Sequence, residues 1–177
     1  MKPLFISILF LLVACTPHSS HNIYDITTTD FVEQNLTSKQ LSVENITLGM
    51  SFEEVIAARG YPQKIDDLGN VTNYYYKENE TPLFVVNFDR GVVRRITLSS
   101  QYPRLVGESK YGRSKEEVYQ DFGIANEFID QGRIRRFIYN QKGYELFLKG
   151  SEHIGYSFFP PTDELGDHKI INTSNTI

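Results

Sequence analysis

Residues 49–60 read Gly-Met-Ser-Phe-Glu-Glu-Val-Ile-Ala-Ala-Arg-Gly, and residues 112–123 read Gly-Arg-Ser-Lys-Glu-Glu-Val-Tyr-Gln-Asp-Phe-Gly. The two stretches are 63 positions apart, and the correspondence continues without a gap to Tyr76 and Tyr139. Of the 28 positions from Gly49 to Tyr76, nine carry the same residue in the second stretch. A shared register over a helix start, a helix end and a turn indicates an internal duplication.

Each stretch predicts a short, capped helix. Ser51 and Ser114 are suited to be N-cap residues, and each is followed three positions later by a glutamate, which completes a capping box. Gly60 and Gly123 stand where a helix ends. The glutamates of the first turn lie where the helix dipole favours negative charge, so we interpret them as structural rather than catalytic.

Strand-like patterns separated by turn residues follow each helix. They predict an α+β fold class, a tandem duplication of a helix plus a four-stranded antiparallel meander. The two units are expected to form one concave antiparallel sheet, with the helices packed on one face of the sheet. The first unit is expected at residues 29–100 and the second at 101–161, before a polar tail at 162–177. The predicted strands are Gln63–Asp67, Val71–Lys77, Leu83–Phe88, Val92–Ser99, Asn126–Asp130, Ile134–Asn140, Tyr144–Lys149 and His153–Phe159.

The N-terminus predicts a signal peptide at residues 1–14. Lys2 supplies a positive charge, and an apolar run extends from Leu4 to Ala14 with one serine in it. The run is shorter than the ~20 apolar residues that a membrane-spanning helix needs. It ends in Leu-Val-Ala before Cys15, the sole cysteine of the chain.

This ending resembles the lipobox of bacterial lipoproteins, in which the cysteine becomes acylated, as by palmitate, and starts the mature chain. Cys15 is therefore the predicted lipidation site, and residues 15–28 are the predicted tether. The residue after the cysteine is Thr16 rather than aspartate, which by that resemblance favours the outer membrane. His18 and His21 lie three positions apart in the tether, but no further ligand residues complete a metal site.

Composition excludes several functional classes. The chain has 177 residues and a formal net charge of −4, whereas nucleic-acid binders are usually strongly basic, so we expect no nucleic-acid partner. One cysteine cannot form an internal disulfide or a thiolate metal site. No nucleophile elbow, HExxH motif or phosphate loop occurs. We therefore predict a protein that is not an enzyme and binds no cofactor and no metal.

The stretch Ile46-Thr-Leu-Gly-Met-Ser, followed by Val55, Gly60 and Pro62, resembles the opening motif of the SmpA/OmlA outer-membrane lipoproteins. That family includes the small E subunit of the β-barrel assembly machine. The tandem arrangement also resembles the fold of the β-lactamase inhibitory protein, which opens similarly. The second stretch departs from the motif with Arg113 and Ala125. The inhibitor is also disulfide-bonded, which this chain cannot be.

Two surface features are candidates for partner binding. Aromatic residues alternate along two matched strands, so half should point away from the core, and Tyr75 and Ile138 are our candidates. A basic cluster contains Arg133 and Arg135, which we expect to share one face of a strand and to complete the contact surface. The cluster also includes Arg94, Arg95 and Arg136.

The leading hypothesis is a non-enzymatic, acylated lipoprotein anchored at the periplasmic face of the outer membrane. The resemblance implies a protein-binding module in an envelope-assembly or secretion complex, with the membrane and another envelope protein as partners. A first alternative is a periplasmic enzyme inhibitor, by likeness to the β-lactamase inhibitory protein. A second alternative is a binder of a small ligand or lipid.

Overall fold

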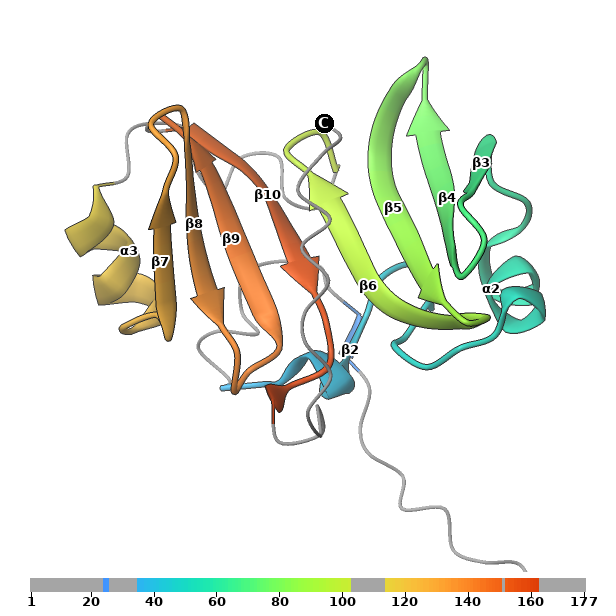
Figure 1. Cartoon of the computed structure of the whole chain (residues 1–177), viewed down its shortest axis with the longest axis horizontal. Helices are drawn as coiled ribbons and strands as arrows, with labels where there is room; N and C mark the ends of the chain where they lie inside the picture. Colours follow the sequence, from blue (N-terminus) through green and yellow to red (C-terminus); the bar gives the residue numbers. More distant parts are fainter. Residues whose placement is uncertain (1–23, 26–34, 103–113, 151, 163–177) are drawn as a thin grey trace, which may run out of the picture.

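Eight strands hydrogen-bond into one antiparallel sheet that makes up most of the protein (Figure 1). The computed structural model describes residues 24–25, 35–102, 114–150 and 152–162. The strand order in space is β3-β4-β5-β6-β10-β9-β8-β7. The strands are β3 (Lys64–Asp67), β4 (Val71–Glu78), β5 (Thr81–Asp89), β6 (Val92–Ser99), β7 (Glu127–Asp130), β8 (Ile134–Tyr139), β9 (Tyr144–Lys149) and β10 (Glu152–Phe158).

The helical parts of the described chain are short. The α-helices α2 (Phe52–Arg59) and α3 (Lys115–Phe122) have eight residues each, and they lie near opposite ends of the sheet (Figure 1). A single 3-10 turn, η1 (Ser38–Gln40), precedes β2 (Leu41–Ser42). Strand β2 pairs in parallel with β1 (Tyr24–Asp25), apart from the large sheet.

Two rows of apolar and aromatic side chains, each of which crosses seven of the eight strands, form the core face of the sheet. Residues directly opposite each other in antiparallel strands point to the same face, so the pairing register defines each row. The first row is Phe128, Phe137, Leu146, Tyr156, Leu98, Phe84 and Tyr76. The second row is Tyr139, Tyr144, Phe158, Ile96, Val86, Tyr74 and Ile65.

Both α-helices cover this core face. Val55 of α2 and Val118 of α3 are completely buried in the same apolar cluster as the two rows. Phe52 of α2 contacts Phe88, with 4.4 Å between the ring centroids. The capping boxes form as predicted, since the Ser51 and Ser114 hydroxyls each accept a hydrogen bond from the backbone of the N3 glutamate.

A tyrosine ties each helix end to the sheet. The hydroxyl of Tyr76 donates to the carbonyl of Gly60 at 3.0 Å, and the hydroxyl of Tyr139 donates to that of Gly123 at 3.0 Å. Burial raises the pKa of Tyr76 to about 12, and it raises the pKa of Tyr139 further. Both phenols therefore stay protonated donors at neutral pH.

The segment before α2 closes the core near the middle of the sheet. Leu36, Leu41, Val43 and Ile46 are buried in the same cluster as the strands. Its polar anchor is Ser38, whose hydroxyl donates to the carbonyl of Phe159 at 2.6 Å. The segment thus joins the core, although its own regular structure is short.

The predicted strand positions agree with the structure to within two residues, but the predicted fold class is wrong. The protein is not a tandem α+β pair of helix-plus-meander units. In the part of the chain that the structure describes, it is predominantly β, with one large antiparallel sheet and two α-helices of only two turns each. The physical reason is that the helices are short, so the aromatic rows of the sheet supply most of the core. The pairing of β10 with β6 joins the strands into one sheet, as expected.

The predicted signal peptide, the lipidation site Cys15 and nearly all of the predicted tether lie outside the described residues, as does all but the first residue of the predicted tail. Within the ranges that are described, no helix has the length and apolar character required to cross a membrane. The boundaries predicted for the two units remain predictions.

Candidate binding surface

The face of the sheet opposite the core rows carries a row of its own, which we call the outer row. It runs Glu127, Ile138, Glu145, Ser157, Thr97, Val85, Tyr75 and Lys64, one residue from each strand. Both described α-helices pack on the core face, so neither covers this one. We call this side of the sheet the outer face.

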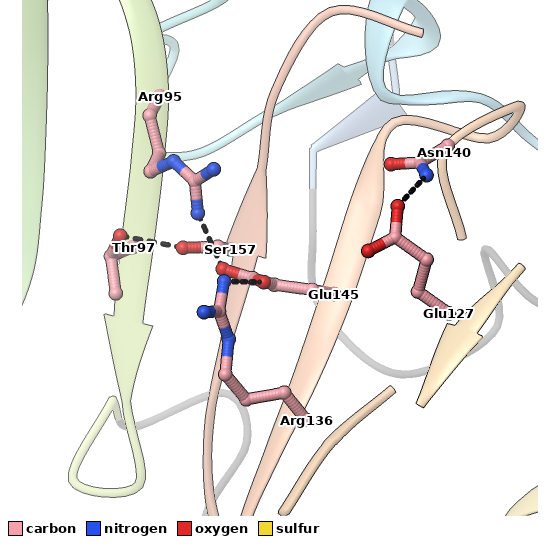
Figure 2. Close-up of polar contacts among 7 residues, drawn as sticks. All are labelled: Arg95, Thr97, Glu127, Arg136, Asn140, Glu145 and Ser157. Carbon is pink, nitrogen blue, oxygen red and sulfur yellow. Dashed lines mark hydrogen bonds and ion pairs between the residues drawn. The ribbon is translucent and has the colours of Figure 1, made fainter. Parts of the chain in front are cut away.

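Glu145 is the most unusual residue of the outer row. It is a carboxylate at the second position of β9, yet only 1% of it is exposed. Two arginines surround it from different strands, as Figure 2 shows. Arg95 of β6 forms an ion pair with one carboxylate oxygen, and Arg136 of β8 donates to the other at 2.6 Å. We call these three residues the arginine–glutamate triad.

The triad crosses the junction between β6 and the C-terminal strands. Strand β10 lies between β6 and β9, so Arg95 reaches across it to contact Glu145. The residue of β10 in the outer row is Ser157, whose hydroxyl lies 2.7 Å from that of Thr97 (Figure 2). Because these side chains are small, they leave space above the sheet for the long arginine side chain.

Aromatic rings support both guanidinium groups. Arg95 lies over the ring of Phe159 at 4.9 Å, and Arg136 lies over that of Phe147 at 5.6 Å. Such cation–π contacts hold a guanidinium by its flat face and leave its edge free to donate hydrogen bonds. The side chains of Arg95 and Arg136 remain 29% and 22% exposed.

The far end of the outer row is built around Tyr75. Lys64 of the edge strand lies over the Tyr75 ring at 4.8 Å and donates to Asp66 at 2.9 Å. This hydrogen bond lowers the pKa of the Asp66 carboxyl and raises that of the Lys64 ammonium. Burial is the main reason why the pKa of Tyr75 is raised.

The structure places the predicted contact residues only partly together. Tyr75 and Ile138 both lie in the outer row, but five strand spacings separate them, about 24 Å. Arg135 lies opposite Leu148 of the buried core, so it points to the other side of the sheet from Ile138. Arg133 precedes β8 in a turn.

Sequence reasoning thus selected the wrong arginines for this face. The expectation that Arg133 and Arg135 share one strand face with the contact surface is wrong, because β8 begins at Ile134. The arginine that accompanies Ile138 is Arg136, two positions before it. The alternation of side chains along a strand was the signal that could have identified it.

The triad gives the outer face a fixed group of charges. Within the described part of the chain, no group of three or more His, Cys, Asp or Glu side chains could hold a metal ion. The triad contributes two positive charges and one negative charge, all held in place by hydrogen bonds and ring contacts. Such an arrangement can attract and orient an anionic group.

Comparison with solved structures gives remote similarity. A cysteine-rich secretory protein from Staphylococcus aureus is 10% identical with a TM-score of 0.42, and covers 66% of this chain and 45% of its own. An extracellular protein containing an SCP domain from Bacillus anthracis is 13% identical with a TM-score of 0.40, and covers 63% of this chain and 43% of its own. This chain therefore spans less than half of either protein. A search of curated proteins found no match.

Comparison with protein families corrects the resemblance suggested by the opening motif. The profile of a family described as CAP-associated N-terminal matches residues 48–157, which is more than half of the chain. The SmpA/OmlA resemblance is wrong, because this longer match covers its short motif from Leu48 onward and assigns it to another family. The likeness to the β-lactamase inhibitory protein fails with it. The chain belongs to the CAP-associated N-terminal family.

Proposed function

We propose that this protein is a non-enzymatic, lipid-anchored module that binds another protein outside the cytoplasm through its outer face. The observation that carries this proposal is the outer row itself. Ile138, Glu145 and Ser157 of this row are buried, but its other side chains are exposed or partly exposed at regular strand spacings, and neither described α-helix packs over them. The family description, CAP-associated N-terminal, is compatible with an accessory module of this kind.

The anchor part of the proposal comes from the sequence. Leu12, Val13 and Ala14 precede Cys15, and the chain holds no other cysteine. A doubly or triply acylated cysteine gives stable membrane attachment, whereas a single acyl chain is marginal. Location at the outer membrane and membership of an envelope-assembly or secretion complex remain untested predictions. The family match has removed the resemblance to SmpA/OmlA on which they depended. We carry forward only the anchor and protein binding.

Replacement of Cys15 tests the anchor. We expect Cys15→Ser to move the protein from the membrane fraction to the soluble fraction, because the serine hydroxyl cannot take the thioether-linked lipid. The measurement is fractionation of cells that express the tagged protein, with metabolic labelling by an alkyne palmitate analogue. Continued sedimentation of the variant with membranes would contradict the lipidation of Cys15.

Site-specific photocrosslinking tests protein binding and its location. We would place a photoreactive phenylalanine analogue at Tyr75 or Val85, which are half-buried residues of the outer row. The matched control position is Glu116, an exposed residue of α3 on the core side. We expect one discrete crosslinked species from each outer position and none from the control.

The outcome is decisive in either direction. A crosslink of equal yield from Glu116 would show that contact is not specific to the outer face, and the proposal would fail. The absence of any crosslink from both outer positions, in cells where the protein is folded and anchored, would also contradict it. Mass spectrometry of the species then identifies the partner.

A further inference from the structure

The triad holds more cationic than anionic charge. Arg95 and Arg136 converge on one carboxylate, that of Glu145, although the chain as a whole has a net charge of −4. We propose that these two arginines form a binding site for a carboxylate group on an acidic segment of the partner protein. This inference rests on the proposed function and names the chemistry of its partner.

The hydrogen-bonding capacity of the triad supports this site. Two guanidinium groups carry ten N–H donors, and a carboxylate accepts about four hydrogen bonds. Only one nitrogen of each arginine is bonded to Glu145. The Nε of Arg136 is buried, and no acceptor from the described residues reaches it. This buried Nε is out of a ligand's reach, but the other guanidinium nitrogens that do not bond to Glu145 belong to side chains that are 29% exposed in Arg95 and 22% exposed in Arg136, and they supply donors for a ligand.

Pre-organisation is the second argument. The rings of Phe147 and Phe159 and the carboxylate of Glu145 hold the two arginines in place before any ligand arrives. A free arginine side chain loses rotamer freedom when it binds, which reduces affinity. In the triad the arginine side chains already lose this freedom when the protein folds. Binding of a carboxylate therefore requires little further ordering of the donors.

Stability alone is a weak explanation for the triad. Buried ion pairs often contribute no more to the free energy of unfolding than apolar residues of similar volume, because their desolvation is costly. The equivalent pair in the N-terminal half of the sheet is Tyr75 and Val85, which need no ionic partner. A binding role accounts for the arginines where a structural role does not require them.

The surroundings favour a protein segment over a free small anion. Next to the triad the outer row continues through the buried Ser157 to Thr97, Val85 and Tyr75, which are partly exposed on β6, β5 and β4. A polypeptide with one acidic side chain above the triad can lay its neighbouring groups along these residues. A small anion would use the arginines alone and gain nothing from the rest of the row.

Binding of an acidic peptide tests the proposal directly. The probe is fluorescein-labelled hexaglutamate with an amidated C-terminus, and the measurement is fluorescence anisotropy at low salt with the folded protein. The control peptide is hexaglutamine of the same design. We expect Arg95→Gln and Arg136→Gln each to weaken hexaglutamate binding by about tenfold, the effect of losing a charged hydrogen bond.

Two neighbouring arginines supply matched controls with the same change in net charge. Arg94 is exposed, and it lies at the irregularity of β6 where no residue of β5 is paired with it. Arg135 points to the core face of the sheet, away from the triad. We expect Arg94→Gln and Arg135→Gln to change the affinity by less than about twofold. If a glutamine variant at the triad does not fold, Arg95→Lys and Arg136→Lys keep the charge but lose the planar fork, and they should still weaken binding.

Three results would overturn the proposal: no binding of hexaglutamate by the native protein, equal weakening by all four glutamine variants, or equally tight binding of free N-acetylglutamate. The last result would identify a small-anion site. The proposed function is tested separately by the crosslinks from Tyr75 and Val85. A discrete crosslinked partner together with no hexaglutamate binding would retain the protein-binding function and remove only this site.

Discussion

The N-terminal half of the sheet, β3–β6, and the C-terminal half, β7–β10, share their local contacts but differ on the outer face. Each half has a capped helix, and the carbonyl of its C-cap glycine accepts a hydrogen bond from a tyrosine hydroxyl. In both, an aspartate side chain accepts from a turn glycine, with Asp67 and Gly69 in one half and Asp130 and Gly132 in the other. These contacts stabilise the short helices and turns, and they do not involve the side chains of the outer face.

The two halves differ on the outer face, at the residues that directly precede Tyr76 and Tyr139. In the N-terminal half, Tyr75 lies opposite Val85, and both are half-buried as on an ordinary solvated sheet face. In the C-terminal half, the corresponding pair is Ile138 and Glu145, and both are buried. Similar sheet geometry therefore supports two kinds of outer surface. The second has a buried carboxylate that fixes two arginines.

The hairpin turns of the two halves also differ in how closely they pack against the rest of the protein. The β4–β5 turn holds Asn79 and Glu80 in the left-handed region, and the Glu80 side chain is almost fully exposed. At the β8–β9 turn, Gly143 also has a positive φ of 75°. A Cβ at Gly143 would overlap the Phe159 carbonyl oxygen and the Ser38 hydroxyl. Only the C-terminal turn is packed against other segments in this way.

The largest expected effect follows from that packing. Gly143→Ala should lower the free energy of unfolding by about 3–5 kcal/mol, because it adds both a left-handed backbone penalty and an overlap with fixed atoms. Urea denaturation followed by circular dichroism measures the loss. The matched change is Glu80→Gly, which should be neutral or stabilising. Equal losses at both positions would contradict the difference between the two turns.

The second effect concerns the triad. Glu145→Gln leaves two partly buried guanidinium groups without their carboxylate, and should lower the free energy of unfolding by about 2–3 kcal/mol. The control is Val85→Thr at the corresponding position of the other half, where a loss below about 1 kcal/mol is expected because the site is half-exposed. Denaturation at low and high salt measures both variants. If Glu145→Gln lowers the free energy of unfolding no more than Val85→Thr does, the proposed electrostatic difference between the two halves is wrong.

Much of the local structure could be predicted from the sequence. The capping boxes at Ser51 and Ser114 and the alternation of apolar residues are local signals, and they set the helices and strands to within two residues. The pairing of β6 with β10 has no local signal, because Gly155 and Ser99 are far apart in sequence and any two strand edges could meet. The fold class was predicted wrongly for another reason: it gave the helices the same weight as the sheet, although each helix has only eight residues and the sheet has eight strands.

The candidate surface was predictable to a smaller extent. Tyr75 and Ile138 were placed in the outer row by alternation, and Arg136 could have been placed there in the same way. The contact between Arg95 and Glu145 could not, since it crosses β10 and depends on the pairing of β6 with β10. The short motif that begins at Ile46 misled the family assignment, because most of it is shared with a family whose profile extends from residue 48 to residue 157.

The third effect tests the shared tyrosines. Tyr76→Phe and Tyr139→Phe each remove a buried hydroxyl that donates to a glycine carbonyl, and each should cost about 1–1.5 kcal/mol at pH 8. Burial raises the pKa of Tyr76 to about 12, above its unfolded value near 10. The stabilisation by Tyr76 is therefore present below about pH 10 and is lost as the pH rises toward 12. We expect the difference between native protein and Tyr76→Phe to shrink from pH 8 to pH 11, as measured by urea denaturation. A difference that does not vary with pH would contradict the protonated donor.

The smallest effect compares the two helix starts. Ser114→Ala should lower the free energy of unfolding by about 1 kcal/mol through loss of its N-cap hydrogen bond. Ser51→Ala should cost about 0.5 kcal/mol, toward the lower end of the range for an N-cap. The reason is that two backbone hydrogen bonds hold the chain before α2 to β6: Gly49 donates to Val93, and Val93 donates to Met50, both at 2.8 Å. They keep this helix start in place when the serine hydroxyl is removed. Thermal denaturation of both variants measures the difference, and a larger loss at Ser51 would mean that the contacts to β6 do not support the helix start.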